Sequence, residues 1–166
     1  MAVEIFLRVD GVTGGSQSYG HKGWADLLNW SWDLERAPNP LAALGERALH
    51  MNEISLVKTV GVDSAALMTL FAGGTPIKSA EINIVPVVGK RDAQQKYIAI
   101  ALEDVLIKSI STGGSLDESV FKEKITLIFG KVKYEFHHYA EIGPSGGART
   151  LTSYAFDWDS KAPTAH

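Results

Sequence analysis

The sequence predicts a mainly β fold, a two-sheet β-barrel of long bent antiparallel strands with one short flanking α-helix. Three observations support this prediction. Apolar and polar residues alternate in about seven segments, which is the period of a half-buried strand. Two of the longer segments change phase by one residue, as strands do when they bend and serve two sheets. Only residues 63–74 combine helix-capping residues at both ends with apolar residues at helical spacing.

Length and composition favour one domain, residues 1–166, with one shared core. A net charge of -3 gives no electrostatic reason to expect a nucleic-acid partner, which needs clustered Lys and Arg. The absence of cysteine removes disulfides, thiolate catalysis and zinc–sulfur sites. No apolar run approaches the roughly 20 residues that a membrane helix needs, so we expect no membrane insertion.

The start of the chain lacks the pattern of a secretory signal. Glu4 and Arg8 interrupt the stretch in which a signal peptide has an apolar run of about 7–15 residues. We therefore expect a protein that starts in the cytoplasm and has no signal peptide.

The first two predicted strands set the candidate channel residues. Residues 3–9 place Val3, Ile5, Leu7 and Val9 on one face. In residues 24–34, the apolar side chains fall on even positions, Leu28, Trp30, Trp32 and Leu34, and predict a core-facing stripe. Leu27, Asn29 and Ser31 then face away from the core. In a monomer that face is surface, whereas in a ring of copies it is a candidate lining for a central hole.

The next segment predicts a loop and then the helix. Pro38 and Pro40 disfavour a strand ladder over residues 36–49. Leu41, Leu44 and Leu49 make this loop more apolar than a solvent-exposed connection needs, so we expect them to contribute to an interface between subunits. After a strand through Ile54, Leu56 and Val60, the helix is capped by Asp63 or Ser64, shares Leu67, Leu70 and Phe71 on one face and stops at Gly73.

The remaining strands are the long ones. Residues 76–88 alternate without interruption, whereas residues 97–111 change phase at Glu103-Asp104. The following strand, residues 125–136, changes phase at Gly130. A Gly/Pro-rich turn at 143–147 leads to a last strand at 151–158. The two phase changes predict β-bulges or sharp bends.

The polar residues predict no catalytic residue, metal ligand or cofactor site, and hence a protein that is not an enzyme. His137 and His138 are strand neighbours, so they point to opposite faces and cannot easily ligate one ion. The two Gly-Gly-Ser segments, at 14–16 and 113–115, lack the flanking residues of a nucleophile elbow and are more typical of turns. The carboxylate pairs Glu103-Asp104 and Asp117-Glu118 are sequence neighbours, which does not place two carboxyls across a substrate.

Several motifs, taken in order, resemble the haemolysin-coregulated protein (Hcp) family of type VI secretion systems. The segment His21-Lys22-Gly23 leads to Leu27-Leu28-Asn29-Trp30-Ser31-Trp32. The longest likeness runs from Tyr97-Ile98-Ala99-Ile100 to Ser111-Thr112-Gly113-Gly114-Ser115 and on through Val132-Lys133-Tyr134-Glu135. Tyr154-Ala155-Phe156-Asp157-Trp158-Asp159 closes it. Each motif alone is weak, but their shared order covers nearly the whole chain.

The resemblance implies a two-sheet barrel that assembles as a homo-hexameric ring. Such rings stack into a tube that a contractile sheath propels from the cell, with a VgrG-type spike at the tip and effector proteins in the lumen. The loop at 36–49 departs from the family, in which it is often glycine-rich and reaches towards neighbouring subunits or rings.

Two other interpretations compete with a tube protein. One is a monomeric β-barrel that binds a small apolar ligand, which the large Trp, Ile and Leu side chains of the core faces argue against. The other is a hydrolase, which lacks the required residue constellations. The mass in solution distinguishes a ring from both alternatives.

Overall fold

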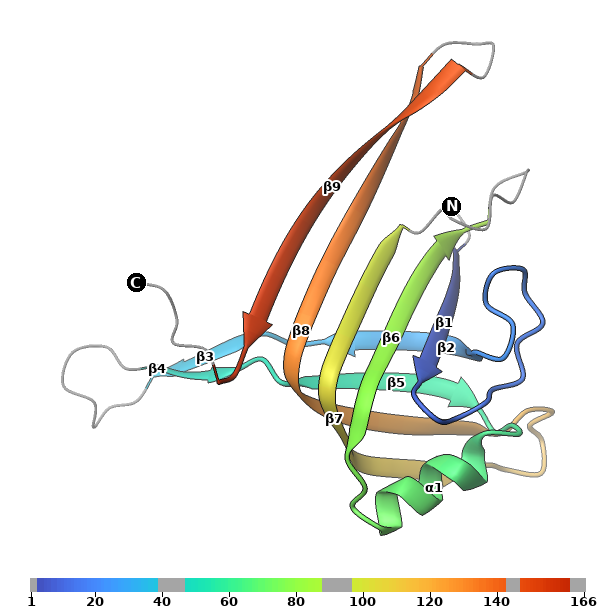
Figure 1. The fold of residues 1–166 in the computed structure, drawn as a ribbon. Coiled ribbons are helices and arrows are strands. Elements are labelled where there is room, and N and C mark those ends of the chain that lie inside the picture. Colours follow the sequence, from blue (N-terminus) through green and yellow to red (C-terminus); the bar gives the residue numbers. More distant parts are fainter. Residues whose placement is uncertain (1–2, 39–46, 88–96, 143–146, 162–166) are drawn as a thin grey trace.

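The computed structural model describes residues 3–38, 47–87, 97–142 and 147–161 (Figure 1). The N-terminal half holds β1 (Val3–Val9), β2 (Ala25–Trp32), β3 (Glu35–Pro38), β4 (Arg47–His50), β5 (Glu53–Thr59) and helix α1 (Ser64–Ala72). The rest holds β6 (Ile77–Pro86), β7 (Ile98–Gly113), β8 (Lys122–Ile142) and β9 (Gly147–Asp159).

Six of the strands close into an antiparallel barrel. The order β5-β2-β1-β6-β7-β8 closes because the first part of β8 also pairs with β5, from Glu53↔Ile128 to Thr59↔Lys122. The second part of β8 pairs instead with β9, from Lys131↔Asp159 onward. The first part of β8 therefore closes the barrel and its second part carries β9 in the same sheet, and the predicted mainly β barrel with one helix is confirmed.

Strands β7 and β8 bend together where the sequence changes phase. The pairs Glu103↔Lys131 and Val105↔Phe129 place Asp104 opposite Gly130. Asp104 has a φ of 54°, in the left-handed region, and a Cβ on Gly130 would lie 3.1 Å from the Cβ of Asp104. The buried positions move from Leu102 to Val105 and from Phe129 to Val132, which confirms both predicted phase changes. A further irregularity, between Ile107 and Ser109, was not predicted.

Large aliphatic side chains fill the barrel. Each of the following is at most 1% exposed: Ile54, Leu56, Ile82, Ile100, Leu102, Ile125 and Leu127. Leu67 of α1 joins this core, whereas Phe71, expected on the same face, is exposed. A barrel that binds a small apolar ligand needs interior space, which these side chains occupy. Within the described residues, no helix is long and apolar enough to span a membrane.

The segment expected to be a loop contains a two-stranded arm. β3 and β4 pair from Glu35↔His50 to Pro38↔Arg47, so the prediction that residues 36–49 avoid a ladder is wrong at both ends. Pro38 is the last residue of β3, where a missing N–H interrupts no further pairing. The arm projects from the barrel on the side opposite to the connection between β5 and α1 (Figure 1).

Candidate functional site

One wall of the barrel presents a band of small hydroxyl side chains to the outside. This wall consists of β2 from residue 28, β5, the first part of β8 and β7 from residue 106, in that order. The register Ser31↔Ser55↔Thr126↔Ser109 aligns one hydroxyl from each strand. The hydroxyls of Ser55 and Thr126 lie 3.5 Å apart. We call the outward side of this wall the hydroxyl face.

Two of the three predicted channel residues lie on the hydroxyl face. Asn29 and Ser31 are exposed, and Asn29 pairs with Val57 in the row next to the serines. Leu27 is 7% exposed and belongs to the core, so the prediction that it faces away from the core is wrong. The register between β2 and β5 shifts between Leu27 and Asn29, which brings Leu27 to the same side as Trp30 and leaves Leu28 exposed.

The end of the hydroxyl face nearest the arm is hollowed. The concavity has a volume of about 440 Å³ and is lined by Ser31, Asp33, Glu35, His50, Asn52, Glu53, Ser55 and Lys108. Lys108 forms an ion pair with Glu53, and it occupies the irregular position of β7 between Ile107 and Ser109. Bulges of this kind re-aim a side chain, which accounts for a lysine at this place.

Neither edge of the wall has a further strand partner within the described chain, although helix α1 contacts β7. β2 pairs with β1 only through Ala25, Asp26 and Leu27, so beyond Leu27 it has β5 as its sole strand partner in the described chain. β7 beyond Val105 likewise pairs only with β8 among the described strands. Unpaired strand edges are templates for pairing with another chain. Among the described residues, the wall therefore has one edge without a strand partner on each side, and we call these two the open edges.

The predicted interface leucines are only partly within the described chain. Leu41 and Leu44 lie outside the described residues. Leu49 belongs to β4, where its backbone is opposite Arg36, and its side chain lies outside the described part. Their contribution to an interface stays a prediction.

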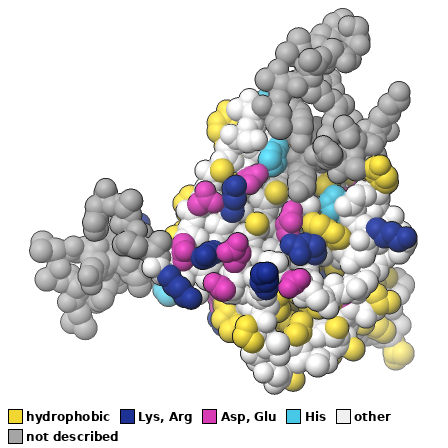
Figure 2. Space-filling view, viewed as in Figure 1, with side chains coloured by type: hydrophobic (Ala, Val, Ile, Leu, Met, Phe, Trp, Pro, Cys, Tyr) yellow, Lys and Arg dark blue, Asp and Glu magenta, His cyan; other side chains and the backbone are white. Residues whose placement is uncertain are grey.

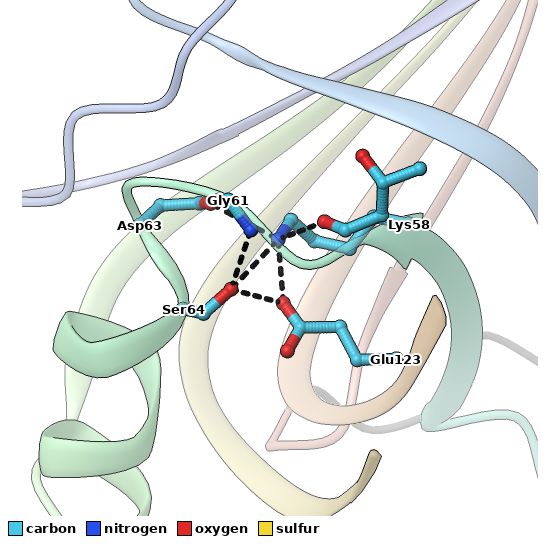
Figure 3. A network of polar contacts seen from close by, with 6 residues as sticks. Lys58, Gly61, Asp63, Ser64 and Glu123 are labelled. Atoms are coloured by element: carbon cyan, nitrogen blue, oxygen red, sulfur yellow. Dashed lines mark hydrogen bonds and ion pairs between the residues drawn. The ribbon is translucent and has the colours of Figure 1, made fainter. Parts of the chain in front are cut away.

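A buried ion cluster anchors the helix to the end of the barrel (Figure 3). Lys58 of β5, 2% exposed, pairs with Glu123 of β8 at 2.5 Å and with Asp63 at 3.0 Å. The hydroxyl of Ser64 donates to Glu123 Oε1 at 2.8 Å and accepts from the Gly61 N–H at 2.9 Å. Asp63 is the residue before the helix, as predicted, but its carboxylate pairs with Lys58 and makes no capping hydrogen bond.

Sequence reasoning missed this cluster, although a signal existed. Lys58 continues the inward-facing set of Ile54 and Leu56, and Glu123 does the same for Ile125 and Leu127. A charged residue in an inward position needs a partner, so two such residues on paired strands indicate an internal ion pair.

His21, in the connection between β1 and β2, is a second buried polar group. It is 4% exposed, its ring stacks on Phe6 with centroids 4.2 Å apart, and it forms a hydrogen bond with Asn83. These contacts hold the connection between β1 and β2 against the sheet.

The second part of β8, which pairs with β9, carries paired charges on its surface. Figure 2 shows acidic and basic side chains interleaved on the side of the molecule seen in Figure 1. On β8, Glu135 contacts Lys133 at 3.0 Å and His137 at 3.2 Å. The hydrogen bond and charge of Glu135, with the charge of Asp157, raise the pKa of Lys133 above its ordinary value.

His137 and His138 point to opposite faces of the strand, as predicted, because His137 contacts Glu135 whereas His138 stacks on Phe136. No group of three potential metal ligands occurs within the described residues.

A comparison with protein families identifies this architecture. The protein-family model described as "Type VI secretion system effector, Hcp" matches residues 6–136, which is most of the chain. The chain belongs to the Hcp family. Membership confirms the resemblance that the sequence motifs indicated and links this protein to type VI secretion.

Individual Hcp proteins agree with the assignment. Protein hcp1 of Pseudomonas aeruginosa is 29% identical over 149 residues, covering 89% of this chain and 91% of the relative. The crystal structure of Hcp1 from Salmonella typhimurium has a TM-score of 0.71 at 23% identity, covering 97% of this chain and 96% of that one. A structure of a type six secretion system protein has a TM-score of 0.77 at 18% identity, covering 95% and 96%. The likeness to the Salmonella Hcp1 structure shows that the Hcp fold extends over nearly the full chain.

Proposed function

We propose that this Hcp protein is the structural tube component of a type VI secretion system. Copies join side by side into a hexameric ring, rings stack into a tube, and the tube leaves the cytoplasm with effector proteins in its lumen. Residues 1–166 then form a single tube module. The contractile sheath and the VgrG-type spike are the partners that the family resemblance implies.

The open edges of the wall support ring closure. The four strand segments alternate in direction, so β2 at one edge runs opposite to β7 at the other. When copies are related by rotation about an axis along the strands, the β7 edge of one meets the β2 edge of the next in antiparallel orientation. Each copy uses two different surfaces, so the contact is head-to-tail. Such contacts close into a ring when the rotation from one copy to the next is a whole fraction of a full turn.

The hydroxyl face supports a channel lining. In such a ring the wall of every copy turns the same outward face to the axis, because its other face packs on the barrel core. Small hydroxyl side chains leave space and offer hydrogen bonds to a polar cargo surface. Effector proteins carried in this lumen would contact Asn29 and Ser31.

The open-edged wall with its polar outward face is the observation that carries the proposal. The mass of the purified protein in solution, together with electron microscopy, tests it: we expect about six times the chain mass and rings with a central hole. We further propose that Leu41, Leu44 and Leu49 add apolar contacts between copies, so replacing all three with Ser is expected to weaken the ring. A protein that stays monomeric at high concentration, with no hole visible, contradicts the proposed function.

A further inference from the structure

Two lysines of β8, Lys122 and Lys124, lie on the hydroxyl face. Lys124 is in the row of Asn29, because both residues align with Val57 of β5. Lys122 lies two residues earlier, about 7 Å along the strand, and points to the same side. Both side chains are exposed, whereas Glu123 between them is buried in the internal ion cluster (Figure 3). We call Lys122 and Lys124 the lysine pair.

The lysine pair has no acidic partner within the described chain. On the second part of the same strand, by contrast, Lys131 lies 3.5 Å from Glu103 and Lys133 lies 3.0 Å from Glu135. The cross-strand neighbours of the lysine pair are uncharged: Thr59, Val57, Ser111 and Gly113. Each ammonium group therefore has donors available for an acceptor outside the chain.

The charge of the hydroxyl face changes sign along its strands. Asp33 and Glu35 line the concavity at the arm end, are exposed and form no ion pair within the described residues. The lysine pair lies towards the other end, where β5 finishes at Thr59 beside Lys122. In a ring, rotation keeps each residue at one level of the channel. The lysine pairs of all copies then form a basic band, and the carboxylates at the arm end form an acidic band.

We propose that the basic band binds an acidic surface of the cargo protein. Carboxylates of the cargo accept hydrogen bonds from the lysine ammonium groups, and the Asn29 amide in the same row donates a further one. The acidic band repels the same surface, so the cargo is held at the level of the lysine pair. This inference rests on the proposed function and adds to it the chemical class of the cargo.

A compact acidic protein surface fits this channel better than a nucleic acid does. Channels for single-stranded nucleic acid are positive along the track of the backbone and place aromatic side chains against the bases. The rows of Lys124 and Ser31 contain no aromatic side chain. A polyanion that extends along the channel also has to pass the acidic band, whereas a compact patch contacts the basic band alone.

Binding of charged peptides to the purified ring tests the inference. Fluorescence anisotropy follows labelled hexaglutamate and hexalysine, and we expect the wild-type ring to bind hexaglutamate more tightly, with an affinity that falls as salt is added. Lys122→Gln with Lys124→Gln is expected to weaken hexaglutamate binding about ten-fold or more. Lys22→Gln with Lys78→Gln is the matched control, because it removes the same charge from exposed lysines outside the wall and should bind like the wild type.

A reversal variant distinguishes a lost charge from a damaged structure. Lys122→Glu with Lys124→Glu is expected to keep the mass of the ring and to bind hexalysine more tightly than hexaglutamate. Three results overturn this inference while the ring stands: no preference of the wild type for hexaglutamate, equal hexaglutamate binding by the wild type and the Gln variant, or tighter binding of hexathymidylate than of hexaglutamate. A wild type without rings contradicts the proposed function, and this inference with it.

Discussion

At the scale of single residues, Lys58 shows how one side chain depends on distant parts of the sequence. Its partners Glu123 and Asp63 come from β8 and from the turn before α1, and the Glu123 pair spans 65 positions. Strand periodicity indicates that Lys58 points inward, but it does not identify the partner, because the pairing of β5 with β8 is a property of the closed barrel. The sequence therefore indicates that Lys58 and Glu123 each point inward, but only the closed barrel shows that they are partners.

Removing Lys58 is expected to destabilise the protein strongly. Lys58→Met leaves two carboxylates buried without a cation, and breaking a buried ion pair from one side costs about 3–5 kcal/mol. The free energy of unfolding from urea denaturation measures the loss. Lys108→Met is the matched control, because its pair with Glu53 is about half exposed and such pairs contribute at most about 1 kcal/mol. Equal losses in the two variants would show that the cluster has no special role.

At the scale of elements, the sequence predicts the position of a strand bend where the alternation of apolar and polar residues is unambiguous on both sides of the bend. The bends at Asp104 and Gly130 were located because polar residues interrupt clear alternation on both sides. The irregularity in β2 was missed because Leu27 and Leu28 are both apolar, so either phase suits the pattern. The arm of β3 and β4 was not predicted because proline disfavours strand pairing. Pro38 is compatible with the pairing because it occupies the final position of β3.

Gly130 is expected to be required by the paired bend. Gly130→Ala places a Cβ 3.1 Å from the Cβ of Asp104, whose backbone already has a positive φ, and overpacking of this kind costs about 1–3 kcal/mol. The midpoint of thermal unfolding is the readout. Gly113→Ala provides the comparison, because nothing lies within 4 Å of its added Cβ and the stability should stay within about 1 kcal/mol of wild type. If Gly130→Ala is as stable as Gly113→Ala, the neighbouring strands absorb the contact and the bend does not depend on glycine.

At the scale of the whole molecule, the hydroxyl face exists only after the barrel closes. Its aligned residues, Ser31, Ser55, Ser109 and Thr126, come from four strands scattered over the sequence. Sequence periodicity singled out Ser31 and Asn29 because the large tryptophans beside them mark the core side of β2. The other three hydroxyls are neighbours because of the strand register. Alternation within a strand predicts which face a residue lies on, but it does not predict which residues of other strands lie beside it.

Ser31→Gln is therefore expected to act on cargo and not on assembly. Ser31 is exposed and its cross-strand neighbour is another serine, so a longer amide can extend outward without displacing the core. In a ring the substitution recurs in every copy at one level of the channel, so its effect on a narrow lumen is multiplied by the number of subunits. We expect rings of unchanged mass with a several-fold lower yield of co-purified effector protein. Ser119→Gln, in the exposed turn between β7 and β8, adds the same side chain away from the hydroxyl face and should keep the effector yield of the wild type. An effector yield that is the same for both variants would mean that cargo contacts another surface, even if the ring itself is correct.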